Sequence, residues 1–317
     1  MKKKLIPAIL SSMLIIGVLA GCSNKSENTS ENTSGSKTVS IEHAMGTTDI
    51  PENPKNIVIL TNEGLEAVLT LGVKPVGAVT GVTGEWYEHT KNELTDVKPV
   101  GMEGQPNLEA IVALKPDLII GNKMRHEKIY DQLSAIAPTV YSDTIRGAWK
   151  DNFNFYAEVL NKKSEGDKAI KEYESKINHI KETYEDKLDN EISLVRFMDG
   201  KTRIYLGDTF AGTILKEIGF KRPAAQQGTE FVNEIGKERL GEAEGDVMFY
   251  FTYELGDGKG ITREEEWLND PLFKSLQVVK NNKAYKVDDT IWNTAGGIKA
   301  ANLMVDDLTN MLKDGKI

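Results

Sequence analysis

The segment Ser164–Asn190, SEGDKAIKEYESKINHIKETYEDKLDN, decides how the chain is organised. It contains no proline, and no glycine after Gly166, and its apolar residues recur three or four positions apart, which predicts one amphipathic helix. Ser164 is a candidate N-cap, with Asp167 three residues later as its capping-box partner. About 24 helical residues make a rod of roughly 36 Å, which is the width of a domain. The apolar face comprises Ala169, Ile170, Tyr173, Ile177, Ile180, Tyr184 and Leu188.

This rod lies near the middle of the chain, between two segments of similar appearance. It is either a long surface helix of a single domain or a rigid spine that joins two lobes. In both flanking segments, 39–161 and 191–317, short apolar stretches alternate with helical patterns, which favours parallel α/β units. We therefore expect an α/β protein of two lobes. Each lobe should hold a short, mainly parallel sheet flanked by helices, and one long rigid helix in 162–190 should join them.

One block of sequence is echoed in the two segments. PNLEAIVALKPDLIIG and EIGKERLGEAEGDVMFYFTY each contain a glutamate, a helical stretch, a turn with an aspartate and an apolar strand. Alignment of Asp117 with Asp246 places Glu109 opposite Glu238. Helix–turn–strand units are common, so coincidence stays open from the sequence, but the echo fits two lobes of one architecture.

Composition and charge exclude several classes. The chain has 317 residues, enough for two domains, with 39% hydrophobic and 27% charged residues and a formal net charge of −9. An acidic chain argues against nucleic acid as a partner, because phosphate backbones require clustered Lys and Arg. The single cysteine excludes an internal disulfide.

The first 22 residues indicate the compartment. MKKK precedes an apolar run, Leu5–Ala20, which is too short and wrongly flanked for a typical membrane span. The sequence LAGC that ends at Cys22 resembles a bacterial lipobox, although an ordinary free cysteine is the alternative. We expect a lipoprotein signal peptide over 1–21 and a disordered tether over 22–38, which has almost no apolar side chain to bury. Cys22 would then anchor the protein to the extracytoplasmic face of the cell membrane.

Candidate binding residues follow the expected strands. In open α/β sheets, ligands bind beyond the carboxyl ends of the strands. In the first segment, Trp86, Arg125 and Arg146 occupy such loops. In the second, the candidates are Arg196, Arg203, Tyr205, Arg222, Tyr253, Trp292 and Asn293. Strand alternation should point Arg203 and Tyr205 to the same face.

From the end of the tether onward, the chain resembles the iron–siderophore substrate-binding lipoproteins of ABC importers, the class that includes the ferrichrome and cobalamin binders. Within that family, NKMRHEKIYDQLSAIAPTV and the IWNTAGG loop make it most similar to Gram-positive receptors for hydroxycarboxylate siderophores, such as staphyloferrin B and schizokinen. The resemblance implies a ligand held between two lobes that close only slightly, because one helix is a stiff connection. The motifs are IEHAMGTTDIPENPKNIV, LGVKPVGAV, PNLEAIVALKPDLIIG, TRIYLGDTFAGTILKEIGFKRP and IWNTAGG.

The resemblance also implies the chemistry of the site. A ferric carboxylate siderophore is an anion whose iron already has six oxygen ligands, so the protein needs neither a cofactor nor a metal site of its own. It needs cations that bind carboxylates, and arginine does this in a bidentate manner. Arg125 is the strongest candidate, with a solvated surface arginine as the alternative. Trp86 and Trp292 either contact the siderophore or pack the lobes, and Asn293 and Tyr253 are hydrogen-bond donors.

Glu109 and Glu238 are the implied docking residues, because family members present one glutamate on each lobe to arginines of the permease. A glutamate favoured by the helix macrodipole is the alternative reading of both positions. We therefore expect a monomer whose partners are a ferric siderophore, ABC permease subunits and, through Cys22, the membrane.

Two other readings compete. A cell-surface α/β enzyme is disfavoured, because the mature chain has no GxSxG, P-loop, GxGxxG after a strand or nucleophilic cysteine. The four histidines show no metal-ligand spacing, so we expect no bound metal ion. A receptor of the same fold could instead carry ferric citrate, a catecholate siderophore, haem or cobalamin, but the loop arginines favour carboxylates.

Overall fold

The computed structural model describes residues 37–317, which belong to one compact unit. The expected signal peptide, Cys22 and nearly all of the expected tether lie outside the described residues. Within 37–317, no helix is both long and apolar enough to cross a bilayer.

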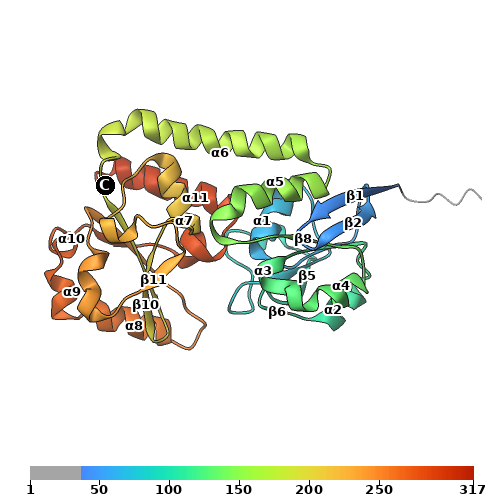
Figure 1. Cartoon of the computed structure of the whole chain (residues 1–317), viewed down its shortest axis with the longest axis horizontal. Coiled ribbons are helices and arrows are strands. Elements are labelled where there is room, and N and C mark those ends of the chain that lie inside the picture. The colour runs from blue at the N-terminus through green and yellow to red at the C-terminus, as the bar shows by residue number, and fades with distance from the viewer. Residues whose placement is uncertain (1–36) are drawn as a thin grey trace, which may run out of the picture. The chain divides into compact units, whose positions relative to one another are not determined.

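The N-terminal lobe contains a β-hairpin and a six-stranded sheet of order β6-β5-β4-β3-β7-β8 (Figure 1). All neighbours in this sheet are parallel except the β5–β6 pair, which confirms the expected mainly parallel lobe. The strands are β1 (Thr38–His43), β2 (Gly46–Pro51), β3 (Ile57–Ile59), β4 (Gly77–Thr80), β5 (Lys98–Met102), β6 (Gln105–Pro106), β7 (Leu118–Asn122) and β8 (Thr139–Ser142). The helices are α1 (Asn62–Thr70), α2 (Leu108–Ala113), α3 (Lys123–His126), α4 (Tyr130–Ser134) and α5 (Trp149–Val159).

The C-terminal lobe contains a mixed five-stranded sheet of order β11-β10-β9-β12-β13. The β9–β12 and β12–β13 pairs are parallel, and the β9–β10 and β10–β11 pairs are antiparallel, so the expectation of a mainly parallel sheet does not hold for this lobe. The strands are β9 (Ile192–Met198), β10 (Lys201–Tyr205), β11 (Val232–Glu234), β12 (Val247–Thr252) and β13 (Ala284–Lys286). The helices are α7 (Phe210–Ile218), α8 (Lys259–Leu268), α9 (Pro271–Ser275), α10 (Gln277–Lys280) and α11 (Ile298–Lys313). The segment 288–297, expected to be a loop, includes a π-helical turn, Thr290–Thr294.

The sequence echo between the lobes is confirmed by its hydrogen bonds. The Asp117 carboxylate accepts bonds from the backbone N–H groups of Lys55 (2.8 Å) and Asn56 (2.9 Å). In the other lobe, the Asp246 carboxylate accepts a bond from the backbone N–H of Glu191 (2.8 Å). Each aspartate precedes a strand that pairs in parallel with the first strand of its sheet, β7 with β3 and β12 with β9. An aspartate therefore holds the start of an inner parallel strand pair in both sheets.

The long helix α6 (Lys163–Thr183) connects the two sheets in the chain and packs on α5 of the N-terminal lobe and on α7 and α11 of the C-terminal lobe (Figure 1). Its 21 residues correspond to roughly 32 Å. The expected extent was wrong at the C-terminal end, where the helix stops and a 3₁₀ turn, Glu185–Lys187, follows. The proposed Ser164 cap was also wrong, because the helix starts earlier and its N-cap, Lys162, makes no side-chain cap bond.

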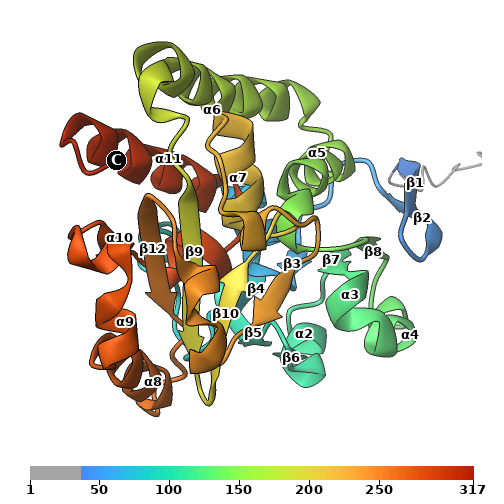
Figure 2. The same cartoon turned by 60° about the vertical axis from the view of Figure 1, so that its left-hand side comes forward.

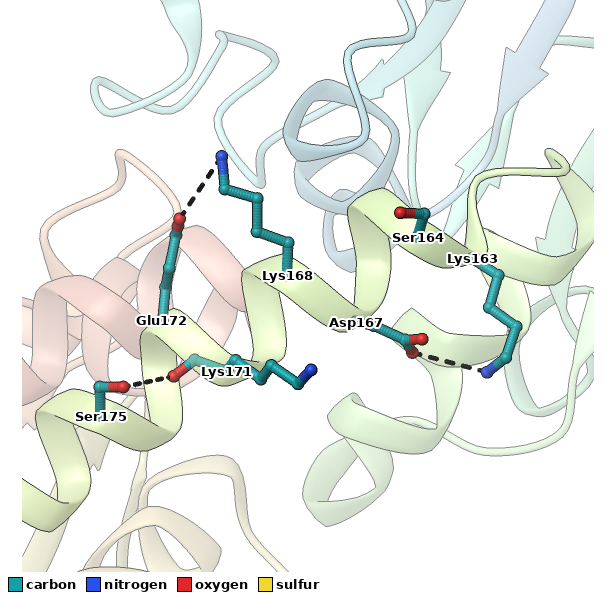
Figure 3. A pocket seen from close by; sticks show the side chains of 7 residues that line it. All are labelled: Lys163, Ser164, Asp167, Lys168, Lys171, Glu172 and Ser175. Carbon is teal, nitrogen blue, oxygen red and sulfur yellow. Dashed lines mark hydrogen bonds and ion pairs between the residues drawn. The ribbon is translucent and has the colours of Figure 1, made fainter.

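The solvent side of α6 carries a shallow hollow lined only by side chains of the helix itself (Figure 3). Along it, Lys163 pairs with Asp167 at 3.5 Å and Lys168 pairs with Glu172 at 3.8 Å. Such exposed pairs one turn apart stabilise a helix by only about 0.2–0.5 kcal/mol each. Three lysines and two acids line it, and it has no wall opposite the helix, so this face is a solvated surface.

The inner face of α6 closes a core that runs through both sheets. Tyr173, Ile177 and Ile180 are buried in it, as their spacing predicted. Successive side chains of a strand point to opposite faces of its sheet. Ile59 and Leu194 therefore point into the core that both sheets share, whereas residues next to them in the chain pack in a separate core on the other face of their own sheet. Helices α8, α9 and α10 cover the far face of the C-terminal sheet (Figure 2).

Candidate functional site

A cavity of about 740 Å³ lies between the lobes, and residues of both line it. This volume is within the range of small-molecule sites. Four arginines reach its wall. Arg125 on α3 and Arg146 come from loops after β7 and β8, whereas Arg196 and Arg203 lie on β9 and β10. Tyr205, Tyr253 and Asn293 line it as well, so seven of the ten predicted ligand residues converge on one cavity.

Arg196 is the most firmly held of the four. Its guanidinium donates to both carboxylate oxygens of Asp289 (2.6 and 2.7 Å), to the Tyr205 hydroxyl (2.8 Å) and to Thr294 Oγ1 (2.6 Å). Burial alone would lower the pKa of Arg196, but the charge of Asp289 raises it, so the side chain stays charged. The guanidinium also lies 4.6 Å from the centre of the Tyr253 ring. Arg196 therefore positions both of the tyrosines predicted to bind the ligand, Tyr205 and Tyr253.

Two other cavity arginines, Arg203 and Arg146, are held more loosely. Arg203 pairs with Glu234 at 2.9 Å, and its side chain is only partly exposed. Arg146 lies 3.8 Å from Asp208 and stacks over the Phe231 ring at 4.2 Å. Arg146 has a φ of +83°, a left-handed conformation that a side chain other than glycine rarely adopts. Such strain persists only where the surrounding contacts hold it, and here the Asp208 carboxylate and the Phe231 ring are those contacts.

Glu103 is a cavity residue that the sequence did not indicate. It lies between β5 and β6, where its carboxylate accepts from Arg125 Nε (3.0 Å) and from the backbone N–H of Asn62 (2.9 Å). Its backbone carbonyl accepts from His126 Nε2 at 2.8 Å. Within the described part of the chain, the two terminal nitrogens of Arg125 have no protein hydrogen-bond partner, so they are available to a ligand.

Two further cavity residues, Glu63 and Tyr87, each have a buried polar atom with no partner in residues 37–317. Burial raises the pKa of Glu63 well above its usual range, and the charges of Glu103 and Glu66 raise it further. A hydrogen bond with the Asn152 side chain opposes this rise. Burial likewise raises the pKa of Tyr87, with Glu103 as the next cause.

A carboxylate of the N-terminal lobe caps a helix of the C-terminal lobe beside the cavity. The N-cap of α11 is Gly297, which has no side chain to offer. Glu66 on α1 fills that role, because its Oε2 accepts from the backbone N–H of Ala300 at 2.9 Å and its Oε1 contacts His89 Nε2 at 2.6 Å. A Cβ at Gly297 would lie 2.5 Å from Glu66 Oε2, so only glycine fits there. An exposed pair, Lys299–Glu93 at 2.9 Å, lies alongside.

Three predicted ligand residues do not line the cavity. Trp292 is fully buried, packs on Phe249 and donates to Asp307 at 3.0 Å, because the π-helical turn directs it into the core. Arg222 donates to two backbone carbonyls and a glutamine inside the C-terminal lobe, where burial lowers its pKa to about 10. Trp86 packs against the shared core. All three serve packing or internal hydrogen bonding.

The two predicted docking residues occupy matching surface positions. Glu109 is exposed in the first turn of α2, and Glu238 is exposed in the first turn of a 3₁₀ helix, Lys237–Ala243. Neither forms an ion pair within residues 37–317. No cluster of three or more potential metal ligands occurs in the same range.

A family model described as periplasmic binding protein matches residues 57–290, most of the fold that builds the cavity. The chain belongs to this family. The relative named "Probable siderophore-binding lipoprotein YfiY", from Bacillus subtilis, is 45% identical over 96% of this chain and 97% of its own length. The Fe(3+)-citrate-binding protein YfmC of the same organism is 31% identical, over 95% of each chain.

Among solved structures, Staphylococcus aureus SirA complexed with staphyloferrin B matches with a TM-score of 0.80 and 38% identity. The match covers 87% of this chain and 99% of SirA. The resemblance found in the sequence and the expected two-lobed α/β fold are therefore confirmed. Members of this periplasmic binding protein family bind substrates for transport.

Proposed function

We propose that this protein is an extracytoplasmic receptor that binds a ferric siderophore of the carboxylate or citrate–hydroxamate type between its lobes and delivers it to an ABC permease for iron uptake. The observation that carries the proposal is the meeting of four arginines, two from each lobe, at one cavity of about 740 Å³. Arginine recognises carboxylates by paired, charge-assisted hydrogen bonds. The siderophore-binding relatives support the same ligand class.

The ligand would make two kinds of contact. Its carboxylates would accept hydrogen bonds from the terminal nitrogens of Arg125 and from Arg146 and Arg203. Its apolar backbone would lie against Phe231 and Tyr253, whose rings the neighbouring arginines hold in place. Asn293, Tyr205 and Arg196 complete the wall on the side of the C-terminal lobe.

We assign a role to each part of the chain by the boundaries expected from the sequence. Residues 39–161 and 191–317 would form the two ligand-gripping lobes, and 162–190, which holds α6 and the 3₁₀ turn after it, would be the spine. A lipid on Cys22, after removal of residues 1–21, would tether a monomer to the membrane through 22–38. Glu109 and Glu238 would each contact arginines of the permease, and their matching exposed positions in the repeated block support this role.

The first experiment identifies the ligand. The protein purified without its first 22 residues is titrated with ferric schizokinen, ferric staphyloferrins, ferric citrate and ferric bacillibactin while tryptophan fluorescence is followed. We expect quenching at micromolar or lower concentration by a carboxylate chelate. A response to ferric bacillibactin alone would reassign the site to a catecholate siderophore. No response to any of the four at micromolar concentration would refute the proposal.

The second experiment tests the site. Arg125→Ala should weaken binding at least tenfold, because a charged hydrogen bond contributes about 1.5–3 kcal/mol. Arg239→Ala is a matched control, since this arginine is equally exposed and pairs with Glu242 outside the cavity. Equal affinity of both variants would remove Arg125 from the site.

The third experiment separates docking from binding. The double variant Glu109→Ala, Glu238→Ala should retain the affinity of the parent protein for the chelate and fail to support uptake of radioactive iron by cells. A variant that loses binding in solution would contradict the docking role.

A further inference from the structure

Every arginine of the cavity already has a carboxylate partner within the protein. Arg125 pairs with Glu103, Arg196 with Asp289, and Arg203 with Glu234, at 2.6–3.0 Å. Arg146 faces Asp208 at 3.8 Å. The four cations are therefore balanced by four anions before any ligand arrives, so the cavity does not attract anions by net charge. Recognition must depend on which guanidinium nitrogens remain free and on what stands beside them.

The four carboxylates differ in their position relative to the cavity wall. Asp208, Glu234 and Asp289 are absent from the cavity wall, whereas Glu103 is part of it. The first three therefore support their arginines from outside the cavity. Glu103 shares the wall with the arginine that it neutralises. A ligand carboxylate bound by the free nitrogens of Arg125 would lie next to the Glu103 carboxylate.

Hydrogen bonds hold both the side chain and the backbone of Glu103 in the cavity wall. One carboxylate oxygen accepts from both the backbone N–H and the side-chain amide of Asn62, at 2.9 and 3.2 Å, at the first turn of α1. The other accepts from Arg125. The hydrogen bond from His126 to the Glu103 carbonyl fixes the backbone as well. The side chain is only 20% exposed, so solvent screens its charge poorly.

We propose that Glu103 is the specificity-determining residue that limits how much negative charge a chelate can bring to Arg125. The inference rests on the proposed function for the identity of the cargo, but its physical content concerns any carboxylate in the cavity. With Glu103 present, chelates that offer one carboxylate or a neutral oxygen to Arg125 are favoured over chelates that crowd several charges there. Two like charges at hydrogen-bonding separation from the same guanidinium repel each other, and the repulsion is stronger where water is scarce.

The substitution that isolates this effect is Glu103→Gln. The amide oxygen of glutamine still accepts a hydrogen bond, so Asn62 or Arg125 keeps a partner while the charge disappears. Glu103→Asp keeps the charge and shortens the side chain. Glu234→Gln is the matched control, because it removes the carboxylate partner of another cavity arginine from outside the wall.

The test uses two probes on the mature protein and the three variants. Ferric staphyloferrin B is followed by fluorescence, and iron-free citrate is followed by calorimetry and by the Nε–Hε resonance of Arg125. For both probes Glu103→Gln should bind about tenfold more tightly than the parent, equivalent to about 1.4 kcal/mol. Glu103→Asp should show no gain, and Glu234→Gln should stay within about threefold. Thermal midpoints of the variants establish that they are folded.

Each outcome decides the matter. Citrate affinity of Glu103→Gln that equals or falls below that of the parent overturns the inference and leaves Glu103 as a residue that only positions Arg125. Absence of citrate binding by Glu103→Gln at millimolar concentration overturns it as well. An equal gain in Glu234→Gln would mean that net charge, not the place of Glu103, sets the selectivity. Failure of the parent to bind any ferric chelate refutes the proposed function, while the citrate result still decides on Glu103.

Discussion

Glu66→Ala is expected to destabilise the protein by about 3 kcal/mol, because the substitution removes the cap that one lobe supplies to a helix of the other. The backbone N–H of Ala300 is fully buried and would lose a charged acceptor, a loss of about 1.5–3 kcal/mol. The nearly buried ring of His89 would lose its partner too, which adds about 1 kcal/mol. Gly297 has no side chain that could replace either contact.

For about 280 folded residues, 1 kcal/mol shifts the thermal midpoint by a little under 2 °C, so we expect a decrease of about 5 °C. Differential scanning calorimetry and urea unfolding measure it. Glu66→Gln keeps an acceptor oxygen and should lose about half as much. Glu93→Ala is the matched control, because it breaks the exposed pair with Lys299 beside the same helix end and should change stability by less than about 0.5 kcal/mol. A Glu66→Ala protein no less stable than Glu93→Ala would refute the cap.

Three further predictions concern stability. Burial raises the pKa of Glu63 in the folded state, so its contribution to stability is complete below the unfolded pKa and is lost as pH rises through the folded one. The stability of Glu63→Gln relative to the parent should therefore increase as pH rises above the unfolded pKa, and a difference in urea midpoint that does not change with pH would contradict this. Gly297→Ala should destabilise by about 1–3 kcal/mol, since its Cβ would meet Glu66, and a neutral result in thermal melting would show that α11 can shift. Asp117→Ala and Asp246→Ala should each lower the free energy of unfolding by about 1 kcal/mol, with faster amide hydrogen exchange at the start of β3 and β9 respectively. Faster exchange in both sheets for either variant would show that the two aspartates do not act locally.

Features that rest on periodicity could be read from the sequence. The buried face of α6, through Tyr173, Ile177 and Ile180, follows directly from helical spacing. The repeated block marked the equivalent strands because Asp117 and Asp246 perform the same local task. The early end of α6 was not visible, because no glycine or proline follows Thr183 up to Asn190 and the apolar spacing continues through Tyr184 and Leu188.

The errors at the site have a common physical cause. A large aromatic or a charged side chain in a predicted loop was assigned to the ligand because no core contact was apparent. Trp292 instead packs in the core because it lies in a π-helical turn, which has no periodic pattern in the sequence. Arg222 instead donates hydrogen bonds to the carbonyl oxygens of Ile192 and Tyr205, and only the folded sheet brings these two oxygens together.

Glu103 and Glu63 were missed for the opposite reason. Glu103 stands in the sequence GMEG between two short strands, and a charged residue in a glycine-rich turn normally faces water. Glu63 occupies the first turn of a helix, where a glutamate is favoured by the dipole whatever its environment. The groups that surround both are distant in the sequence, such as Arg125 for Glu103 and Asn152 for Glu63, so no local pattern could reveal their burial.

The core shared by the two sheets has a consequence for how the molecule loses its structure. Side chains of α1, α5, α6, α7 and α11 and of both sheets pack in this one cluster, so neither half can be removed without exposing apolar surface of the other. The halves should consequently melt together, in one cooperative calorimetric transition whose van't Hoff and calorimetric enthalpies agree. Either half expressed alone should be aggregation-prone, and a gene cut at the spine should yield soluble protein only when both fragments are produced in the same cell.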